Sequence, residues 1–153
     1  MVAEGKPAPD FELATDGGER VKLSDFRGSP VVLYFYPKDD TPGCTKQACG
    51  IRDAWDAFGD AGATVLGVSP DDESSHAGFR TKYDLPFTLL ADPDHAVAEA
   101  YEVWKQRSLY GRTFMGIERS TFVIDRDGNV ARAFRKVKPG EHAGLVLEVL
   151  ETL

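Results

Sequence analysis

Cysteine is almost absent from this chain, because Cys44 and Cys49 are its only two among 153 residues. In a reducing cytoplasm, where structural disulfides rarely persist, such a pair points to metal binding or redox chemistry. A separation of five residues is unusual for either purpose, since zinc and redox pairs commonly sit three residues apart.

Long apolar runs and an excess of cations are also missing. No run approaches the roughly 20 apolar residues that span a bilayer. The first fifteen residues, MVAEGKPAPDFELAT, hold prolines and acids where a secretory signal needs an apolar core, so we expect a cytoplasmic location. The formal charge of −7 argues against nucleic acid or an anionic membrane as a partner, because phosphate binding needs clustered Lys and Arg.

Continuous apolar and β-branched runs predict buried strands. The clearest is PVVLYFY at residues 30–36, and residues 63–69 and 87–92 follow it. Hairpins are expected at 10–23, around an Asp-Gly-Gly turn, and at 120–135, around an Asp-Gly turn.

Helical periodicity fills the remaining segments except one. The first expected helix runs from the cysteines to about Gly59, with Ile51, Trp55 and Phe58 on one face. A second follows the acid-rich residues 70–74 and carries Phe79 and Tyr83 on its face. Two more are expected over 94–101 and over 141–153, the last with Leu145, Val149 and Leu150 on one side. Residues 101–118 have aromatic residues but no clean period, so a long, partly ordered loop is expected there.

The order of these elements predicts an α/β protein with a thioredoxin-like fold. Early alternation demands a parallel βαβ unit, and the late hairpin adds an antiparallel edge. We therefore expect a mixed central sheet with helices on both faces and an N-terminal β-hairpin. The length fits a single domain over residues 1–153.

Cys44 follows the buried strand 30–36 and begins a helix. Unpaired N–H groups and the helix dipole stabilise a thiolate at such a position and lower the pKa of the thiol. Pro42 favours a helix start, and Gly43 lets a ligand approach the backbone. Thr41 has two interpretations, since its hydroxyl can bond the sulfur and an incoming oxygen or can cap the helix. The alternative for Cys44 is a small buried apolar residue.

None of the three histidines has a telling spacing to serve as a base for Cys44. His76, His95 and His142 fall in separate helical segments, and each is expected to be a solvated helix residue. Attack on a peroxide O–O bond needs a thiolate but no imidazole, because the nucleophile is already an anion and the bond is weak. What remains is to hold the peroxide in line and to stabilise charge on the departing oxygen.

Arg119 suits that task, because an arginine supplies a fixed positive fork. It comes just before the predicted strand 120–125. If that strand runs antiparallel beside 30–36, its beginning lies next to the end of the first strand, where Cys44 sits. The alternative is a surface salt bridge with Glu118 or a neighbour.

The segments FYPKDDTPGCTKQAC and ERSTFVID resemble the peroxiredoxin Q subfamily of thiol peroxidases, also called bacterioferritin comigratory protein, and the similarity covers nearly the whole chain. The resemblance implies that Cys44 is the peroxidatic cysteine, oxidised to sulfenic acid. It implies that Cys49 is the resolving cysteine and that the oxidised state holds a Cys44–Cys49 disulfide.

The same resemblance implies roles for the neighbours. Thr41 and Arg119 activate the thiolate and orient the peroxide, Gly43 lies at the substrate, and Pro37 shields the pocket. Expected substrates are hydrogen peroxide and organic hydroperoxides, the expected reductant is thioredoxin or a similar dithiol, and a monomer is expected. No cofactor is implied, because electrons enter through thiol–disulfide exchange. Relatives generally carry Glu where this chain has Gln47, so the polar network is expected to adjust without loss of activity.

Other classes of function fit less well. A zinc site needs four ligands, and two cysteines with scattered histidines do not supply them. DRDGNV resembles the start of a calcium loop, but Val130 and Lys136 stand where Gly and Glu belong, which indicates a hairpin turn and no metal. A non-catalytic redox sensor or a protein disulfide reductase remains the alternative, although reductases favour a pair three residues apart.

Overall fold

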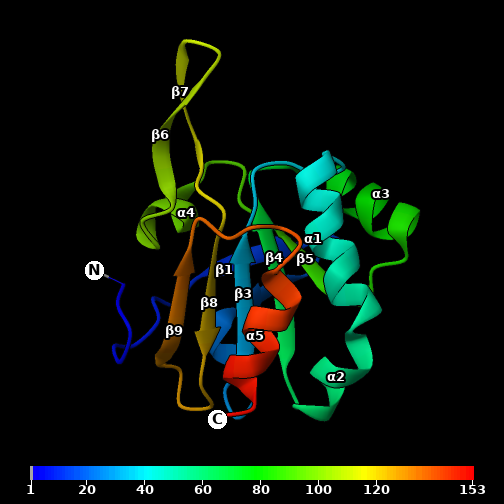
Figure 1. The fold of residues 1–153 in the computed structure, drawn as a ribbon, viewed down its shortest axis with the longest axis vertical. Coiled ribbons are helices and arrows are strands. Elements are labelled where there is room, and N and C mark those ends of the chain that lie inside the picture. Colours follow the sequence, from blue (N-terminus) through cyan, green and yellow to red (C-terminus); the bar gives the residue numbers. More distant parts are fainter. Residues whose placement is uncertain (1) are drawn as a thin grey trace.

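The computed structural model describes residues 2–153, and its main feature is a seven-stranded mixed sheet (Figure 1). The strand order is β2-β1-β5-β4-β3-β8-β9. The strand bounds are β1 (Glu12–Thr15), β2 (Arg20–Lys22), β3 (Val31–Phe35), β4 (Thr64–Ser69), β5 (Thr88–Ala91), β8 (Ser120–Ile124) and β9 (Val130–Arg135). β3, β4 and β5 run parallel, and every other pairing is antiparallel. The predicted mixed sheet, N-terminal hairpin and late hairpin are confirmed.

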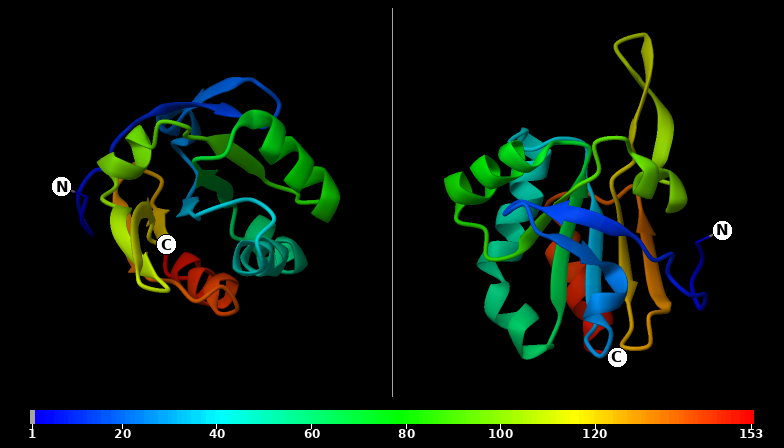
Figure 2. Two further views of the ribbon diagram at one scale, coloured as in Figure 1. Left: turned by 90° about the horizontal axis from the view of Figure 1, so that it is seen from above. Right: turned by 180° about the vertical axis from the view of Figure 1, so that it is seen from behind.

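Helices cover both faces of this sheet, as predicted (Figure 2). The helices on one face are α1 (Pro42–Asp53), α2 (Trp55–Asp60), α3 (Glu73–Tyr83) and α5 (His142–Leu150). α4 (Ala96–Ala100) covers the other face, and the short 3-10 helix η1 (Leu23–Phe26) follows β2. Over residues 2–153, no helix has both the length and the apolar character needed to cross a membrane.

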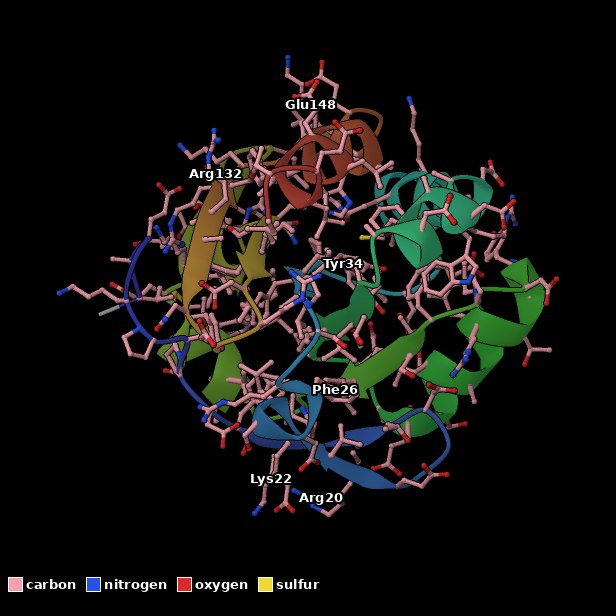
Figure 3. All side chains as sticks on the ribbon, turned by 90° about the horizontal axis from the view of Figure 1, so that it is seen from below. Arg20, Lys22, Phe26, Tyr34, Arg132 and Glu148 are labelled. Carbon is pink, nitrogen blue, oxygen red and sulfur yellow. The ribbon has the colours of Figure 1, made fainter. Side chains whose placement is uncertain are left out.

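β3 passes through the middle of the core, which explains its continuous apolar sequence. Val31, Leu33 and Phe35 pack into the apolar cluster on one face. Val32, Tyr34 and Tyr36 pack into the cluster beneath α1 and α5. In Figure 3 Tyr34 lies between the sheet and the helices, whereas the charged Arg132 and Glu148 point outward. Because both faces of β3 are covered, alternation of polar and apolar residues is not needed.

The pairing of β3 with β8 brings two distant segments to one end of the sheet. The strands run antiparallel with Phe35 opposite Ser120. The end of β3 and the beginning of β8 therefore meet, as the sequence predicted. Arg119, just before β8, is thereby placed beside the connection from β3 to α1.

Two local predictions are wrong. Residues 101–118 are not a loop, because β6 (Trp104–Leu109) and β7 (Arg112–Ile117) form a separate two-stranded sheet that projects from the body (Figures 1 and 2). Its turn residues Tyr110 and Gly111 have φ values of 51° and 77°, the positive values that a tight two-residue hairpin turn requires. The helix expected from the cysteines to Gly59 is also interrupted at Ala54, where φ is −102° and ψ is 18°.

The expectation of three solvated histidines is wrong for two of them. His76 and His142 are fully buried, whereas His95 is half-buried and stacks on the ring of Trp104 with centroids 3.9 Å apart. Polar groups inside the core make hydrogen bonds with the rings of His76 and His142. His142 Nε2 lies 2.7 Å from Thr121 Oγ1, so this hydroxyl satisfies one nitrogen of the ring.

The burial of His142 predicts a specific loss of stability in acid. Burial lowers the pKa of His142 to about 3, and the positive charge of Arg119 adds to the effect. A histidine in the unfolded chain titrates near about 6.5, so between these values the unfolded state binds a proton that the native state excludes. Stability is therefore retained above pH of about 6.5 and falls below it by roughly 1.4 kcal/mol per pH unit.

We expect the urea midpoint of the native protein to fall between pH 7 and pH 5, and His142→Gln to remove a large part of that fall. Glutamine keeps a hydrogen-bonding group for Thr121 but does not titrate. His95→Gln is the matched control and should keep the native pH dependence, because its ring is only half-buried. Equal pH dependence in the native protein and in His142→Gln would contradict the assignment.

Candidate active site

Cys44 lies in the first turn of α1, directly after the loop that leaves β3. Thr41 occupies the N-cap position and Pro42 begins the helix, as the sequence predicted. The N–H groups of a first helical turn have no partners within the helix, and the dipole there favours negative charge. The Cys44 side chain is 2% exposed and packs in the cluster that contains Tyr34 and Ile51. The sulfur therefore lies near the positive end of the helix dipole and is shielded from bulk water.

Arg119 is brought to Cys44 across 75 positions of sequence. Its Nη2 donates to Cys44 Sγ at 3.4 Å, and its Nη1 donates to Gln47 Oε1 at 2.6 Å. The alternative salt bridge with Glu118 does not form, because the Glu118 carboxylate lies 3.6 Å from Lys105 Nζ. In the described part of the chain no carboxylate lies within ion-pair distance of Arg119, so its charge is directed at the sulfur.

Gln47 holds the arginine through a hydrogen bond without neutralising its charge. Its side chain is fully buried, and its Nε2 has no hydrogen-bond partner among the described residues. A glutamate here would accept the same bond but would also compensate the positive charge of Arg119. With Gln47 as the hydrogen-bond partner, the charge of Arg119 is not compensated at this contact.

Gly43 lies close to the guanidinium of Arg119. A Cβ added at Gly43 would lie 3.1 Å from Arg119 Nη2 and 3.5 Å from Pro139 Cγ. The contact with Nη2 is tighter than ordinary van der Waals contact, so the guanidinium would have to give way by a few tenths of an ångström. The sequence predicted a glycine that gives a ligand access to the backbone, and the structure adds that Gly43 makes room for the arginine.

Thr41 forms neither of the two bonds that its position suggested. Its hydroxyl does not cap the helix and makes no hydrogen bond to the sulfur; it donates to the Lys38 carbonyl at 2.8 Å. The hydroxyl proton thus closes the short turn from Lys38 to Thr41, and the oxygen accepts no bond from the N–H groups of the first helical turn. With its proton committed to the backbone, the Thr41 oxygen can act toward a substrate only as an acceptor.

Pro37 and Cys49 complete the set of residues that the sequence predicted for the site. Pro37 is half-buried at the end of β3 and lines, together with Arg119, an open groove of about 550 Å³. Cys49 is half-buried on α1, and both cysteines are free thiols. Because Cys44 and Cys49 both belong to the continuous helix α1, the two cysteines are held apart in the reduced protein.

A buried carboxylate that the sequence did not reveal anchors the loop before Cys44. Asp39 accepts hydrogen bonds from the Tyr36 hydroxyl at 2.6 Å and from Ser75 Oγ at 2.8 Å, and His76 Nδ1 lies 2.7 Å from its Oδ2. His76 Nε2 faces the Leu90 carbonyl at 2.9 Å, which can only accept, so this nitrogen carries a proton. This network ties the loop to α3 and β5 and fixes the entry to α1.

The same cluster includes Asp71, whose carboxylate accepts the Asp39 N–H at 2.7 Å. One potential ligand atom from each of Asp39, Asp71 and His76 lies within 4.8 Å of the others. These atoms already satisfy one another and nearby hydroxyl and N–H groups. Their arrangement is accounted for as a structural network.

The fold and the site together define a thioredoxin-like protein with a cysteine-based redox centre. A model of the AhpC/TSA family matches residues 4–133. The chain belongs to this family and, within it, to the peroxiredoxin Q or Bcp peroxiredoxins, which confirms the predicted family and enzyme class.

Individual relatives cover almost the whole chain. Peroxiredoxin Bcp of Bacillus subtilis is 52% identical over 149 residues, which cover 97% of this chain and 93% of the relative. Peroxiredoxin Bcp of Escherichia coli K12 is 46% identical over 147 residues, covering 96% and 94%. A solved structure of peroxiredoxin Q from Xylella fastidiosa has a TM-score of 0.93 at 35% identity and covers 99% of this chain and 97% of its own.

Proposed function

We propose that this protein reduces hydroperoxides through Cys44, resolves the product with Cys49 and is recycled by thioredoxin or a similar dithiol. The Cys44 thiolate attacks one oxygen of the peroxide, an S–O bond forms and the O–O bond breaks. The departing oxygen takes a proton and leaves as water or an alcohol, and Cys44 becomes a sulfenic acid. The contact between Arg119 Nη2 and Cys44 Sγ carries this proposal.

Each neighbour has a defined part in this step. Arg119 holds the thiolate and stabilises charge on the departing oxygen. The Thr41 oxygen accepts the O–H of the peroxide, because its own proton goes to Lys38. Gly43 leaves the room in which Arg119 and the substrate meet, and Pro37 shields the sulfenic acid from water.

Cys49 completes the cycle. Its thiolate attacks the sulfenic sulfur, water leaves, and a Cys44–Cys49 disulfide forms. A protein dithiol then reduces this disulfide and becomes oxidised itself. The bacterioferritin comigratory protein of Xanthomonas campestris, 41% identical, has a described alkyl peroxide reduction activity. We propose that this protein, too, reduces organic hydroperoxides as well as hydrogen peroxide, and that it acts as a cytoplasmic monomer.

Multiple-turnover peroxide consumption with thioredoxin, thioredoxin reductase and NADPH tests the proposal. Cys44→Ser should abolish consumption. Cys49→Ser should retain one rapid turnover, measured as one equivalent of sulfenic acid, and then stop with thioredoxin as the only reductant. A Cys44→Ser variant as active as the native protein would overturn the assignment.

The same assay separates an enzyme from a non-catalytic sensor or a disulfide reductase. A sensor is oxidised once and consumes no further peroxide on this timescale. A disulfide reductase would reduce a protein disulfide such as insulin without consuming peroxide. Sustained peroxide consumption that depends on Cys44 is expected only of the peroxidase.

A further inference from the structure

The β6–β7 hairpin carries most of the large exposed hydrophobic side chains of the described residues. The large exposed hydrophobic side chains of residues 2–153, with their exposed fractions, are Leu109 (56%), Tyr110 (96%), Phe114 (47%), Met115 (50%) and Leu153 (40%). All but Leu153 belong to this hairpin. Exposed apolar residues gathered on one projecting element, rather than scattered singly, mark an interaction surface.

Cations share this surface with the apolar residues. Cross-strand partners in an antiparallel pair lie on the same face, and the face repeats every second residue. The register pairs Arg107 with Phe114 and Leu109 with Arg112, so these four side chains lie on one face with Lys105. A Cβ added at Gly116 would lie 3.4 Å from the Phe114 ring and 3.6 Å from Arg107 Cδ, which agrees with this arrangement.

The hairpin differs from the rest of the chain in charge. Residues 104–117 contain three cations, Lys105, Arg107 and Arg112, and no acid. Without them the chain has 15 cations against 25 acids, a net charge of −10. Within the described residues no carboxylate lies within ion-pair distance of Arg112. The hairpin is therefore a basic and apolar element on an acidic protein.

This element stands at the end of the molecule where the redox site opens. β6 and β7 project from the same end of the central sheet at which α1 begins (Figures 1 and 2). The groove beside Arg119 and Pro37 is also lined by Lys105 and Arg107. A second groove of about 390 Å³ joins Pro37 to the apolar hairpin residues Leu109 and Phe114. Any macromolecule that reaches the cysteines from this end meets the hairpin.

We propose that the β6–β7 hairpin is the docking surface for the protein dithiol that reduces the oxidised enzyme, a partner with an acidic and apolar surface around its thiols. This inference rests on the proposed function. The partner's thiolate attacks one sulfur of the Cys44–Cys49 disulfide, and a mixed disulfide forms. The partner's second thiol then displaces the enzyme sulfur, leaving the partner as a disulfide and both enzyme cysteines as thiols.

A second copy of this chain is a less suitable occupant. A symmetric contact between two hairpins would bring like charges together at its centre, because the same patch faces itself. A contact between the hairpin and the acidic body of the next copy would give a ring or an open filament, depending on its rotation, and sedimentation would detect either. A redox partner with an acidic and apolar surface complements both the positive charge and the exposed apolar side chains of the hairpin.

The test separates the docking step from peroxide chemistry. The disulfide form, prepared with diamide, needs no peroxidase activity, and its reduction by thioredoxin of net negative charge is followed by tryptophan fluorescence. In Tyr110→Ser/Phe114→Ser and in Arg112→Glu, we expect the second-order rate constant with thioredoxin to fall at least tenfold. Reduction by dithiothreitol should be unchanged, because that small dithiol needs no docking surface.

Two controls match these changes elsewhere on the surface. Leu153→Ser removes an exposed apolar residue, and Arg132→Glu reverses an exposed charge, and both should keep the native rate with thioredoxin. Added salt should slow native reduction by thioredoxin but have little effect on Arg112→Glu. Native rates with thioredoxin in both hairpin variants would overturn the proposal. A second result would also overturn it: a native protein that sediments as a dimer, hairpin variants that sediment as monomers, and the same rate with thioredoxin in all of them.

Discussion

In Arg119→Lys, the rate of Cys44 oxidation by hydrogen peroxide should fall at least about tenfold, a loss of about 1.4 kcal/mol of transition-state stabilisation. Lysine keeps the positive charge but offers one point donor in place of a planar fork. Arg119 uses one arm of that fork on Gln47 Oε1 and the other on Cys44 Sγ. A lysine ammonium cannot hold both contacts in the same geometry. Stopped-flow fluorescence of single-turnover oxidation measures the step without any reductant.

Gly43→Ala tests the same contact without altering the arginine. The new Cβ would stand 3.1 Å from Nη2, so the guanidinium must give way by a few tenths of an ångström and its contact with the sulfur is disturbed. We expect slower oxidation here too, together with slower alkylation of Cys44 by iodoacetamide at neutral pH. Arg132→Lys, at an exposed arginine paired with Glu4, is the control and should oxidise at the native rate. Native oxidation rates in both Arg119→Lys and Gly43→Ala would show that the fork is dispensable.

The part of the site that could be predicted from sequence follows from strand order. A doubly buried strand, a cysteine at the next helix start and an arginine before an antiparallel strand fix each other's positions. Phe35 opposite Ser120 is the register that this reasoning requires. The hydrogen bonds within that site were not predictable, because the Thr41 hydroxyl had several possible partners. The sequence does not show that it donates to the Lys38 carbonyl.

The buried histidines were missed although a signal was present. His76 stands three residues before Phe79 and seven before Tyr83, which is the spacing of one helical face. His142 precedes Val146 and Leu150 by four and eight residues in the same way, and all three are buried. The sequence does not show that these histidines are buried, because their partners Asp39 and Thr121 come from distant segments that no local pattern connects to them.

The hairpin was missed for a different physical reason. A strand reveals itself by alternation only when one of its faces is buried, and β6 and β7 are mostly exposed. Its turn also lacks the usual Asn-Gly or Asp-Gly pair, because Tyr110 takes the first positive φ. A segment without periodicity is therefore an ordered two-stranded sheet rather than a long, partly ordered loop.

Oxidation should unwind the beginning of α1. Both cysteines lie within Pro42–Asp53, a continuous helix in the reduced protein. Five residues of helix separate their α-carbons by roughly 7.5 Å along the axis and turn their side chains about 140° apart. A disulfide needs α-carbons within about 7 Å and side chains that converge. The bond therefore cannot form unless this part of the helix opens and Cys44 leaves the apolar cluster.

Hydrogen exchange measured on the reduced and the disulfide forms tests this opening. Amides of residues 44–53 should exchange faster after oxidation, whereas β3 and β8 should keep their protection, because the sheet does not depend on α1 alone. Mass spectrometry of the same sample should find the intramolecular Cys44–Cys49 bond. Unchanged protection of residues 44–53 in a fully disulfide-bonded sample would rule the unwinding out.

Gly50 supplies a matched variant that changes the opening and nothing else. A Cβ added there meets no atom within 4 Å, so Gly50→Ala fits the reduced structure without strain. Alanine stabilises the interior of a helix by up to about 1 kcal/mol relative to glycine, which should make the opened state about fivefold rarer. Disulfide formation should slow by the same factor, while the attack of Cys44 on peroxide, which needs the closed helix, keeps its rate. The sulfenic acid then persists longer, so Gly50→Ala should accumulate more sulfinic acid than the native protein at high peroxide.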